Sequence, residues 1–440
     1  MASEVPKTVF LAGSTVELIS ALACLAGLGI SDAAVFVERN ISFGTAAMDP
    51  LLAGARSRFP TVRFIELEIK RPVPKKPGKR EWNSFIKRWQ TTRSIREQLD
   101  AASRAHFGMS LHAFGARVQE VYFTALHDYV LVFLAACREK TRVLYPHGFD
   151  HPRREQARDY AYLLRQRSLR TVIETFVQQK KHFGFGGLIL GILGRLLPGT
   201  STVSLPFTGV DRVLTFRTGI DYVPNEVVKV QGLAETFQWL LQLQPWGDLL
   251  RDRENRIRGG SLLLLLPECD CHPIWEKNRS YGLAHLQLLQ RMSQATGLKR
   301  FVIKAHVRSD GSAAEWLARF LIEREKEWKI EILPLALHGL PVEALALTGE
   351  FAAACSLGSC SLPPGLGFGM PHYVSPAASA LFDEGWQEPF WAKYADADRI
   401  LIEESICRDI DKDLNERAAL LSKTAERSTL TGRKHCELSP

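Results

Sequence analysis

Two groups of polar residues, about fifty positions apart, have the types and spacing needed to hold a phosphate. In the segment FVIKAHVRSD, Lys304, His306 and Arg308 follow directly on an apolar run that predicts a strand. Successive side chains of an extended backbone alternate in direction, so these cationic or donor groups converge on one side. We therefore predict that this strand end stabilises a phosphate. A solvated strand end is the alternative, because Lys and Arg are mostly exposed residues.

A second strand end, in EFAAACSLGSCSL, is rich in small hydroxyl residues. Ser356, Gly358, Ser359 and Ser361 follow the apolar run Phe351–Ala354. Hydroxyls and backbone N–H groups in a strand-to-helix turn form an anion cradle, helped by the positive end of the next helix. A simple helix cap is the alternative, and the two roles are compatible.

Between these strand ends, the segment Leu340-Pro341-Val342-Glu343 predicts the start of a helix. Pro341 suits the first helical position, and an acidic residue in the first turn complements the helix dipole. Glu343 either caps this helix or accepts hydrogen bonds from the hydroxyls of a ribose.

The apolar runs that precede these residues predict the strands of two parallel sheets. Leu262–Leu266 is fully apolar, as in a strand buried on both faces. The other strands predicted in the second half are Phe301–Lys304, Ile330–Leu333 and Phe351–Ala354. Those predicted in the first half are Val9–Leu11, Ala33–Glu38, Val62–Leu67, Arg142–Tyr145, Asp211–Phe216 and Val227–Gln231. With helices between the strands, the class is α/β, in the GT-B arrangement of two facing Rossmann-like domains with a crevice between them.

A polar, glycine-ended segment, RDRENRIRGG at residues 251–260, separates the two halves and predicts the domain boundary. The N-terminal domain is predicted to span residues 1–255 and the C-terminal domain residues 256–440. At 440 residues, with 46% apolar and 24% charged residues, the chain is long enough for two globular domains and has a typical soluble composition.

The formal charge of +8 is spread unevenly along the chain. Residues 70–96 carry many Lys and Arg residues but a single acidic residue, Glu81. Such a stretch favours an anionic partner, for which nucleic acid, anionic lipid and a polyanionic saccharide all qualify. A solvated basic loop and helix is the alternative.

Several function classes lack their sequence signals. Neither half contains the dinucleotide fingerprint G-x-G-x-x-G in its strand context, nor the phosphate loop G-x-x-x-x-G-K-[ST]. The cluster Cys269-Asp270-Cys271-His272 is a weak metal signal, because zinc sites use two ligand pairs at set spacing. Residues 1–11 do not resemble a signal peptide, so a cytoplasmic location is expected. The uncharged segment Phe183–Gly194 is shorter than the ~20 residues that a membrane-spanning helix needs.

The order of these motifs resembles the bacterial sialyltransferase and polysialyltransferase group of the GT-B type, whose members use a CMP-activated sugar. The resemblance rests on LLLLLPE, KAHVR, LPVEAL, GSCSL and GMPHYVSP in this order, and on FLAGSTVELISAL near the N-terminus. The group has a Lys-Pro-His-Pro-like motif, a Pro-x-Glu turn and a paired-serine motif. Here Ala305 and Val307 stand at the expected prolines.

The resemblance implies roles for individual residues. Lys304 and His306 would contact the phosphate and cytidine side of CMP, Ser359 and Ser361 would bind that phosphate, and Glu343 would hold the ribose. The group's general base belongs to an acidic pair before a glycine, where this chain has His147 before Gly148. A histidine can take a proton from an acceptor hydroxyl at neutral pH. Asp150 or His151 would orient it or act in its place.

The sequence therefore predicts an inverting, metal-independent glycosyltransferase that needs no cofactor. It would transfer sialic acid, or a related nonulosonic or ulosonic acid, from its CMP ester in the C-terminal domain to a saccharide on the N-terminal domain, as a polysialyltransferase does. Arg308, Ser356 and Gly358 are assigned to the donor; Ser14, Lys75, Lys76, Lys79 and Arg80 are assigned to the acceptor.

Two peripheral features fit this reading. The basic stretch would track a polyanionic saccharide, and the apolar insert at residues 183–197 would rest on the inner face of a membrane. No nucleic acid is expected. The alternatives are a GT-B transferase that uses a UDP- or GDP-sugar and, from another class, a non-catalytic polyanion-binding protein.

Overall fold

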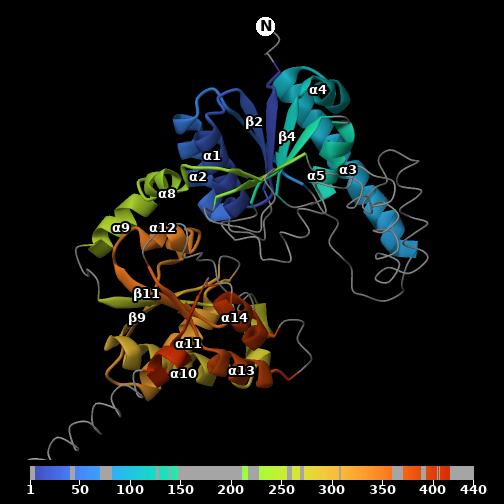
Figure 1. Ribbon diagram of the computed structural model, residues 1–440. Helices are drawn as coiled ribbons and strands as arrows, with labels where there is room; N and C mark the ends of the chain where they lie inside the picture. Colours follow the sequence, from blue (N-terminus) through green and yellow to red (C-terminus); the bar gives the residue numbers. More distant parts are fainter. Residues whose placement is uncertain are drawn as a thin grey trace, which may run out of the picture. The chain divides into compact units, whose positions relative to one another are not determined.

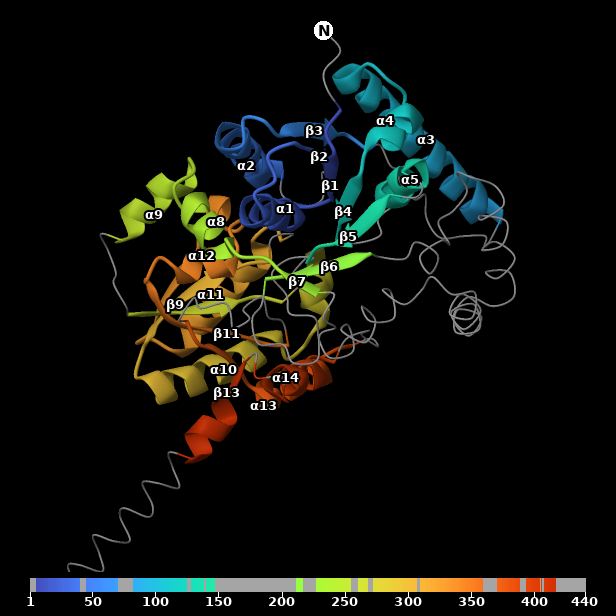
Figure 2. The ribbon, with the colours of Figure 1, turned by 45° about the horizontal axis from the view of Figure 1, so that its top comes forward.

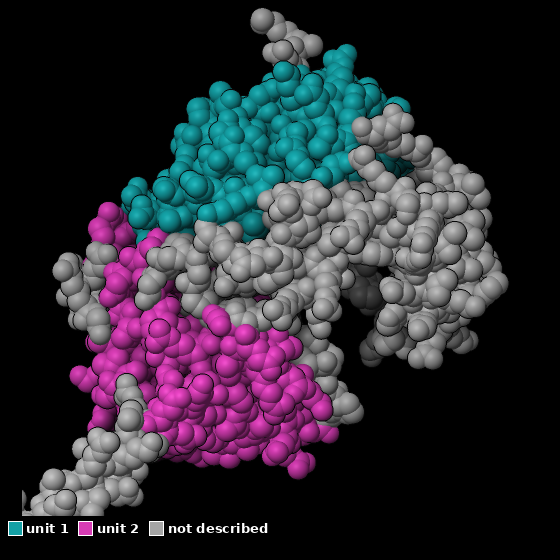
Figure 3. All heavy atoms as spheres, in the orientation of Figure 1, with its two compact units in different colours: residues 1–244 teal, residues 245–440 magenta. Residues whose placement is uncertain are grey.

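The chain folds into two α/β units, divided between Gln244 and Pro245 (Figure 3). The computed structural model describes residues 5–39, 45–69, 82–124, 128–137, 140–146, 211–216, 227–254, 260–267, 272–306, 309–358, 370–387, 393–403, 405 and 407–416. The predicted domain boundary, between residues 255 and 256, lies in a segment outside these ranges.

The first unit is built on a sheet with strand order β3-β2-β1-β4-β5-β6-β7, in which every described pair is parallel. Its strands are β1 (Thr8–Ala12), β2 (Ala33–Glu38), β3 (Arg63–Leu67), β4 (Glu120–Phe123), β5 (Thr141–Leu144), β6 (Arg212–Thr215) and β7 (Val227–Lys229). All five residues of β1 are buried, as expected for a strand covered on both faces.

Helices cover both faces of this sheet (Figures 1 and 2). They are α1 (Thr15–Leu28), α2 (Thr45–Arg58), α3 (Trp82–Phe107), α4 (Leu111–Arg117), α5 (Asp128–Ala136) and α8 (Leu233–Leu240). On one face, α3, α4 and α5 pack on the strands around Phe36, Phe114 and Phe133. On the other face, α8 packs against α1.

The second unit contains a parallel sheet with strand order β10-β9-β8-β11-β12-β13. Its strands are β8 (Ser261–Leu265), β9 (Arg300–Lys304), β10 (Lys329–Ile332), β11 (Phe351–Ser356), β12 (His372–Val374) and β13 (Arg408–Asp409). Its helices are α9 (Trp246–Glu254), η3 (His272–Lys277), α10 (Tyr281–Thr296), α11 (Ser312–Arg324), η4 (Leu335–Leu337), α12 (Val342–Ala346), α13 (Pro376–Glu384) and α14 (Tyr394–Glu403). The core joins β8 and β9 to α10, α11 and α13.

The predicted linker begins inside a helix. Residues 251–254 form the end of α9, and this whole helix belongs to the second unit. Trp246 is buried there and its indole N–H donates a hydrogen bond to the carbonyl of Ala336, at 2.9 Å.

The sequence pattern predicts the strands of both sheets except β4, β12 and β13. β4 has only four residues and runs within a few positions into the apolar helix α5, so its period cannot be separated from that of the helix. Its pairing with β1 aligns Phe10 with Tyr122, whose rings stack at 4.3 Å. The two parallel sheets with their helices confirm the predicted α/β class. No helix among the described residues is long and apolar enough to span a membrane.

Candidate functional site

The strand order of the second sheet predicts where a ligand binds. From β8 the chain proceeds outward through β9 to β10, then returns to the other side of β8 and proceeds through β11 to β13. The direction of winding therefore reverses between β8 and β11. In open parallel sheets ligands bind beyond the carboxyl ends of the strands at such a switch point. Lys304 ends β9, next to β8, and Ser356 ends β11.

Lys304 is a buried cation at this edge of the sheet. Its side chain is only 8% exposed, and Nζ donates a hydrogen bond to the carbonyl of His338 at 2.8 Å. Burial lowers the pKa of Lys304 to about 8, and the charge of Glu343 opposes that shift. The amino group is therefore mostly protonated at pH 7.

His338, which is not among the residues predicted from the sequence, supports Lys304. Its Nε2–H donates to the carbonyl of Leu333 at 2.7 Å, which leaves Nδ1 unprotonated. Nδ1 is buried and has no hydrogen-bond partner among the described residues. Burial, and then the charge of Lys304, lower the pKa of His338, so the ring is neutral at pH 7. The only sequence signal was a histidine in the loop that follows β10.

Glu343 lies in the first turn of α12 and is 1% exposed. Its charge acts on Lys304 and raises the pKa of that amino group. The two residues that the sequence assigned to one nucleotide site are thus electrostatically coupled in the structure. The assignment of Glu343 to a ribose stays a prediction.

At the end of β11, the polar groups of two predicted site residues are engaged within the protein. The hydroxyl of Ser356 lies 2.9 Å from Nε2 of His372, and both residues are buried. The N–H of Gly358 donates to Oδ1 of Asp398 at 2.8 Å. Their part in an anion cradle stays a prediction, because Ser359 and Ser361 lie outside the described residues.

Asp398 stabilises the turn that follows β11 by accepting the hydrogen bond from Gly358. It is completely buried, and its Oδ2 accepts a hydrogen bond from the hydroxyl of Ser379 at 2.5 Å. Burial raises the pKa of Asp398 to about 8, although the hydrogen bonds from Ser379 and Gly358 lower it. The carboxyl is therefore largely protonated at pH 7. An aspartate on an amphipathic helix gave no sequence signal for this role.

Replacing Gly358 by alanine is expected to lower the free energy of unfolding by about 3 kcal/mol. Gly358 has φ +55°, and an added Cβ would lie 2.1 Å from Cδ1 of Tyr394. The control is Gly297→Ala, where φ is +76° but nothing lies within 4 Å of the added atom. Denaturant unfolding measures both variants, and equal losses of stability would contradict the role of the Tyr394 contact.

The remaining donor and base residues of the sequence prediction have less described structure. His306 is half-buried and its carbonyl accepts a hydrogen bond from the N–H of Ser309 at 2.8 Å. The following predicted residues lie outside the described part: Arg308, His147 and Asp150. The same holds for the Cys269–Cys271 cluster. Within the described ranges, no group of His, Cys, Asp and Glu side chains could hold a metal ion.

The predicted acceptor residues are partly described. Ser14 is the N-cap of α1, and its hydroxyl accepts a hydrogen bond from the N–H of Glu17 at 3.2 Å. The assignment of Ser14 to an acceptor stays a prediction. The predicted residues outside the described part are Lys75, Lys76, Lys79, Arg80 and the insert at 183–197. The end of the basic stretch lies on α3, where Arg93 pairs with Glu97 at 2.9 Å.

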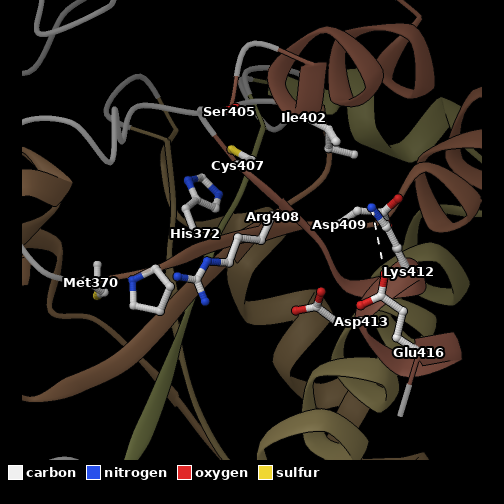
Figure 4. A pocket seen from close by; sticks show the side chains of 11 residues that line it. Met370, His372, Ile402, Ser405, Cys407, Arg408, Asp409, Lys412, Asp413 and Glu416 are labelled. Carbon is white, nitrogen blue, oxygen red and sulfur yellow. Dashed lines mark hydrogen bonds and ion pairs between the residues drawn. The ribbon is translucent and has the colours of Figure 1, made fainter. Parts of the chain in front are cut away.

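A cavity of about 600 Å³ lies at the β12–β13 edge of the second sheet (Figure 4). Its lining includes His372, Cys407 and Arg408. It also includes an ion pair in which Nζ of Lys412 lies 3.8 Å from Oε1 of Glu416. The cavity carries both charge signs and no concentrated cationic surface for a phosphate. It also lies away from the switch point between β8 and β11, so we do not assign the nucleotide to it.

Comparison with known proteins gives a match for the fold only. No protein-family model matches the sequence, and no curated protein matches it. Among solved structures, TcCGT1 in complex with UDP is 12% identical with a TM-score of 0.50, over 93% of this chain and 89% of that chain. The chain has the GT-B fold.

Two other GT-B structures are similar at lower scores. UGT71G1 of Medicago truncatula, complexed with UDP-glucose, is 11% identical with a TM-score of 0.45, over 93% of each chain. UDP-GlcNAc 2-epimerase of Neisseria meningitidis, bound to UDP-GlcNAc, is 10% identical with a TM-score of 0.42, over 83% of this chain and 81% of that chain. The GT-B fold confirms the predicted pair of Rossmann-like domains.

Proposed function

We propose that this protein is a glycosyltransferase that takes a sugar from a nucleotide donor and passes it to a hydroxyl acceptor with inversion. The observation that carries the proposal is the buried, charged Lys304 at the end of β9, one strand from the switch point of the second sheet, where the charge of Glu343 acts on it. A nucleotide leaving group departs with negative charge on its phosphate. A preorganised cation in a water-poor site stabilises that charge more effectively than water does.

Lys304 and its supports have distinct roles in this proposal. The carbonyl of His338 holds Nζ at 2.8 Å, so the cation is oriented before the donor arrives. Glu343 keeps the amino group protonated at neutral pH. His306 and the turn after β11 would supply the remaining donors to the phosphate. These residues need no metal ion for that step.

Two donor classes are supported by different observations. TcCGT1, the solved structure with a TM-score of 0.50, is in complex with UDP, which favours a uridine nucleotide. The order of the sequence motifs favours a CMP-linked acidic sugar as the donor and a saccharide as the acceptor. In that case the basic stretch at residues 70–96 would bind a polyanionic saccharide, and the insert at residues 183–197 would contact a membrane surface. The structural likeness supports the UDP-sugar over the CMP-sugar, and both are carried into the experiment.

A thermal-shift panel of CMP, UDP and GDP tests the proposal. At one hundred times its Kd, the correct nucleotide is expected to stabilise the protein by about 2.7 kcal/mol, which raises the unfolding temperature by about 5 °C or more. A shift with UDP and none with CMP excludes the CMP-sugar. The absence of any shift, together with no nucleotide release from a panel of nucleotide sugars, would favour a non-catalytic polyanion-binding protein.

A further inference from the structure

The first sheet has a switch point of its own, and three strand ends meet there. From β1 the chain proceeds through β2 to β3, then crosses to β4 on the other side of β1 and continues to β5. The switch point therefore lies between β1 and β4. Gly13 and Ser14 follow β1, Thr124 follows β4, and Tyr145 follows β5.

A buried carboxylate stands at this edge. Glu17, in the first turn of α1, is 1% exposed, and its Oε2 accepts a hydrogen bond from the N–H of Gly13 at 2.5 Å. Burial, and then the charge of Glu17, raise the pKa of the Tyr145 hydroxyl, which itself donates to the carbonyl of Leu11 at 2.8 Å. Glu17 therefore lies beside the end of β1, and its charge acts on the hydroxyl of Tyr145, which bonds to the same strand.

Two hydroxyls at the same edge have no hydrogen-bond partner among the described residues. Thr15, at the start of α1, is 2% exposed and its Oγ1 is buried without a partner. Oγ1 of Thr124, at the end of β4, is buried and equally without one. Nearly all buried polar groups in native proteins have a hydrogen-bond partner. Two buried hydroxyls without one, those of Thr15 and Thr124, therefore indicate that a ligand at this switch point supplies the partners.

The chemistry of this cluster selects a hydroxyl. A carboxylate accepts a hydrogen bond from an alcohol, and threonine hydroxyls can donate to the alcohol's oxygen or accept from a neighbouring hydroxyl. A second anion placed directly against Glu17 would be repelled. The edge therefore suits the reacting hydroxyl of an acceptor.

From this geometry we infer that Glu17 is the general base that deprotonates the acceptor hydroxyl; the inference rests on the proposed glycosyl transfer. The acceptor oxygen forms a bond with the anomeric carbon as the bond from that carbon to the donor phosphate breaks. The electron pair of the broken bond leaves with the nucleotide. The proton of the acceptor hydroxyl passes to Oε1 or Oε2 of Glu17 and then to water.

A helix-capping role alone would also place a glutamate here, because Ser14 and Glu17 have the spacing of a capping box. The variant Glu17→Gln separates the two roles, since glutamine keeps an acceptor for the Gly13 N–H but cannot take a proton at neutral pH. Ser110→Ala is the matched control, because it removes the N-cap hydroxyl of α4 in the same unit and leaves Glu17 unchanged.

The experiment compares water and azide as acceptors of the sugar from the donor found in the nucleotide-sugar panel. Water must lose a proton, whereas azide attacks without losing one. Glu17→Gln is expected to slow hydrolysis by about 100-fold or more, and to form the glycosyl azide at least as fast as the wild type, because the carboxylate that repels azide is gone. Ser110→Ala is expected to retain both reactions.

The outcomes distinguish the two levels of inference. Hydrolysis by Glu17→Gln within threefold of wild type overturns the role of Glu17, and so does an equal loss of both reactions. Selective loss of hydrolysis in His147→Ala, with hydrolysis retained in Glu17→Gln, assigns the base to His147 instead. Absence of both products from the wild type with every donor overturns the proposed glycosyl transfer itself.

Discussion

Lys304→Met is expected to weaken nucleotide binding about 10- to 100-fold and to lower the rate of sugar transfer by about 100-fold or more. A charge-assisted hydrogen bond to a phosphate contributes about 1.5–3 kcal/mol to binding. The larger effect on rate follows because the negative charge of the leaving group grows in the transition state. Titration calorimetry measures the first quantity, and release of the nucleotide from its sugar measures the second.

The effect should also depend on pH. Burial lowers the pKa of Lys304 to about 8, so the amino group loses its proton as the pH rises through 8. Wild-type affinity for the nucleotide should therefore fall above pH 8, and Lys304→Met should remove that dependence. In the folded protein without nucleotide, the buried charge costs stability below pH 8. That cost declines as the pH rises from about 8 towards the unfolded pKa of about 10.4.

Lys299→Met is the matched control for this substitution. Lys299 directly precedes β9, at the opposite end of the strand from Lys304, and forms an ion pair with Glu327 on the surface. It should bind nucleotide as the wild type does. Unchanged affinity in Lys304→Met, with the protein folded, would contradict the assignment of Lys304 to the phosphate.

Asp398→Asn is expected to be more stable than the wild type at pH 8, by on the order of 2 kcal/mol, and to lose this advantage at pH 5. The carboxyl of Asp398 has a pKa of about 8 in the folded protein, whereas an aspartate in the unfolded chain ionises near pH 3.9. Between these values only the unfolded chain is ionised. The wild type therefore loses stability as the pH rises from 4 to 8, by at most about 1.4 kcal/mol per pH unit.

The amide that Asp398→Asn introduces is neutral at every pH and can preserve both hydrogen bonds. Its oxygen can accept from the N–H of Gly358, and its NH₂ can donate to the hydroxyl of Ser379. The control is Asp396→Asn on the same helix, where the carboxylate is exposed and pairs with Arg399. Urea unfolding between pH 5 and 9 measures all three proteins. Parallel curves for the wild type and Asp398→Asn would contradict the raised pKa.

Most of the fold could be predicted from the sequence because strands such as β1, β2 and β8 are buried along their whole length. Residues 262–266 and 33–37 are apolar throughout, which distinguishes these runs from the mixed segments between them. β4 was not predicted, because its short apolar run is followed within a few residues by an apolar helix. That omission concealed the switch point of the first sheet, and with it the position of Glu17.

The candidate site divides in the same way between local and tertiary information. The sequence by itself determined that Lys304 and Ser356 end strands and that Glu343 begins a helix, because these depend on periodicity and on turn residues near in the chain. Only the tertiary structure decided what these groups contact. Lys304 donates a hydrogen bond to the carbonyl of His338. The N–H of Gly358 donates to the carboxyl of Asp398, which lies 40 residues further along the chain. Burial and partners come from segments distant in sequence, and they set the pKa values on which the proposed chemistry depends.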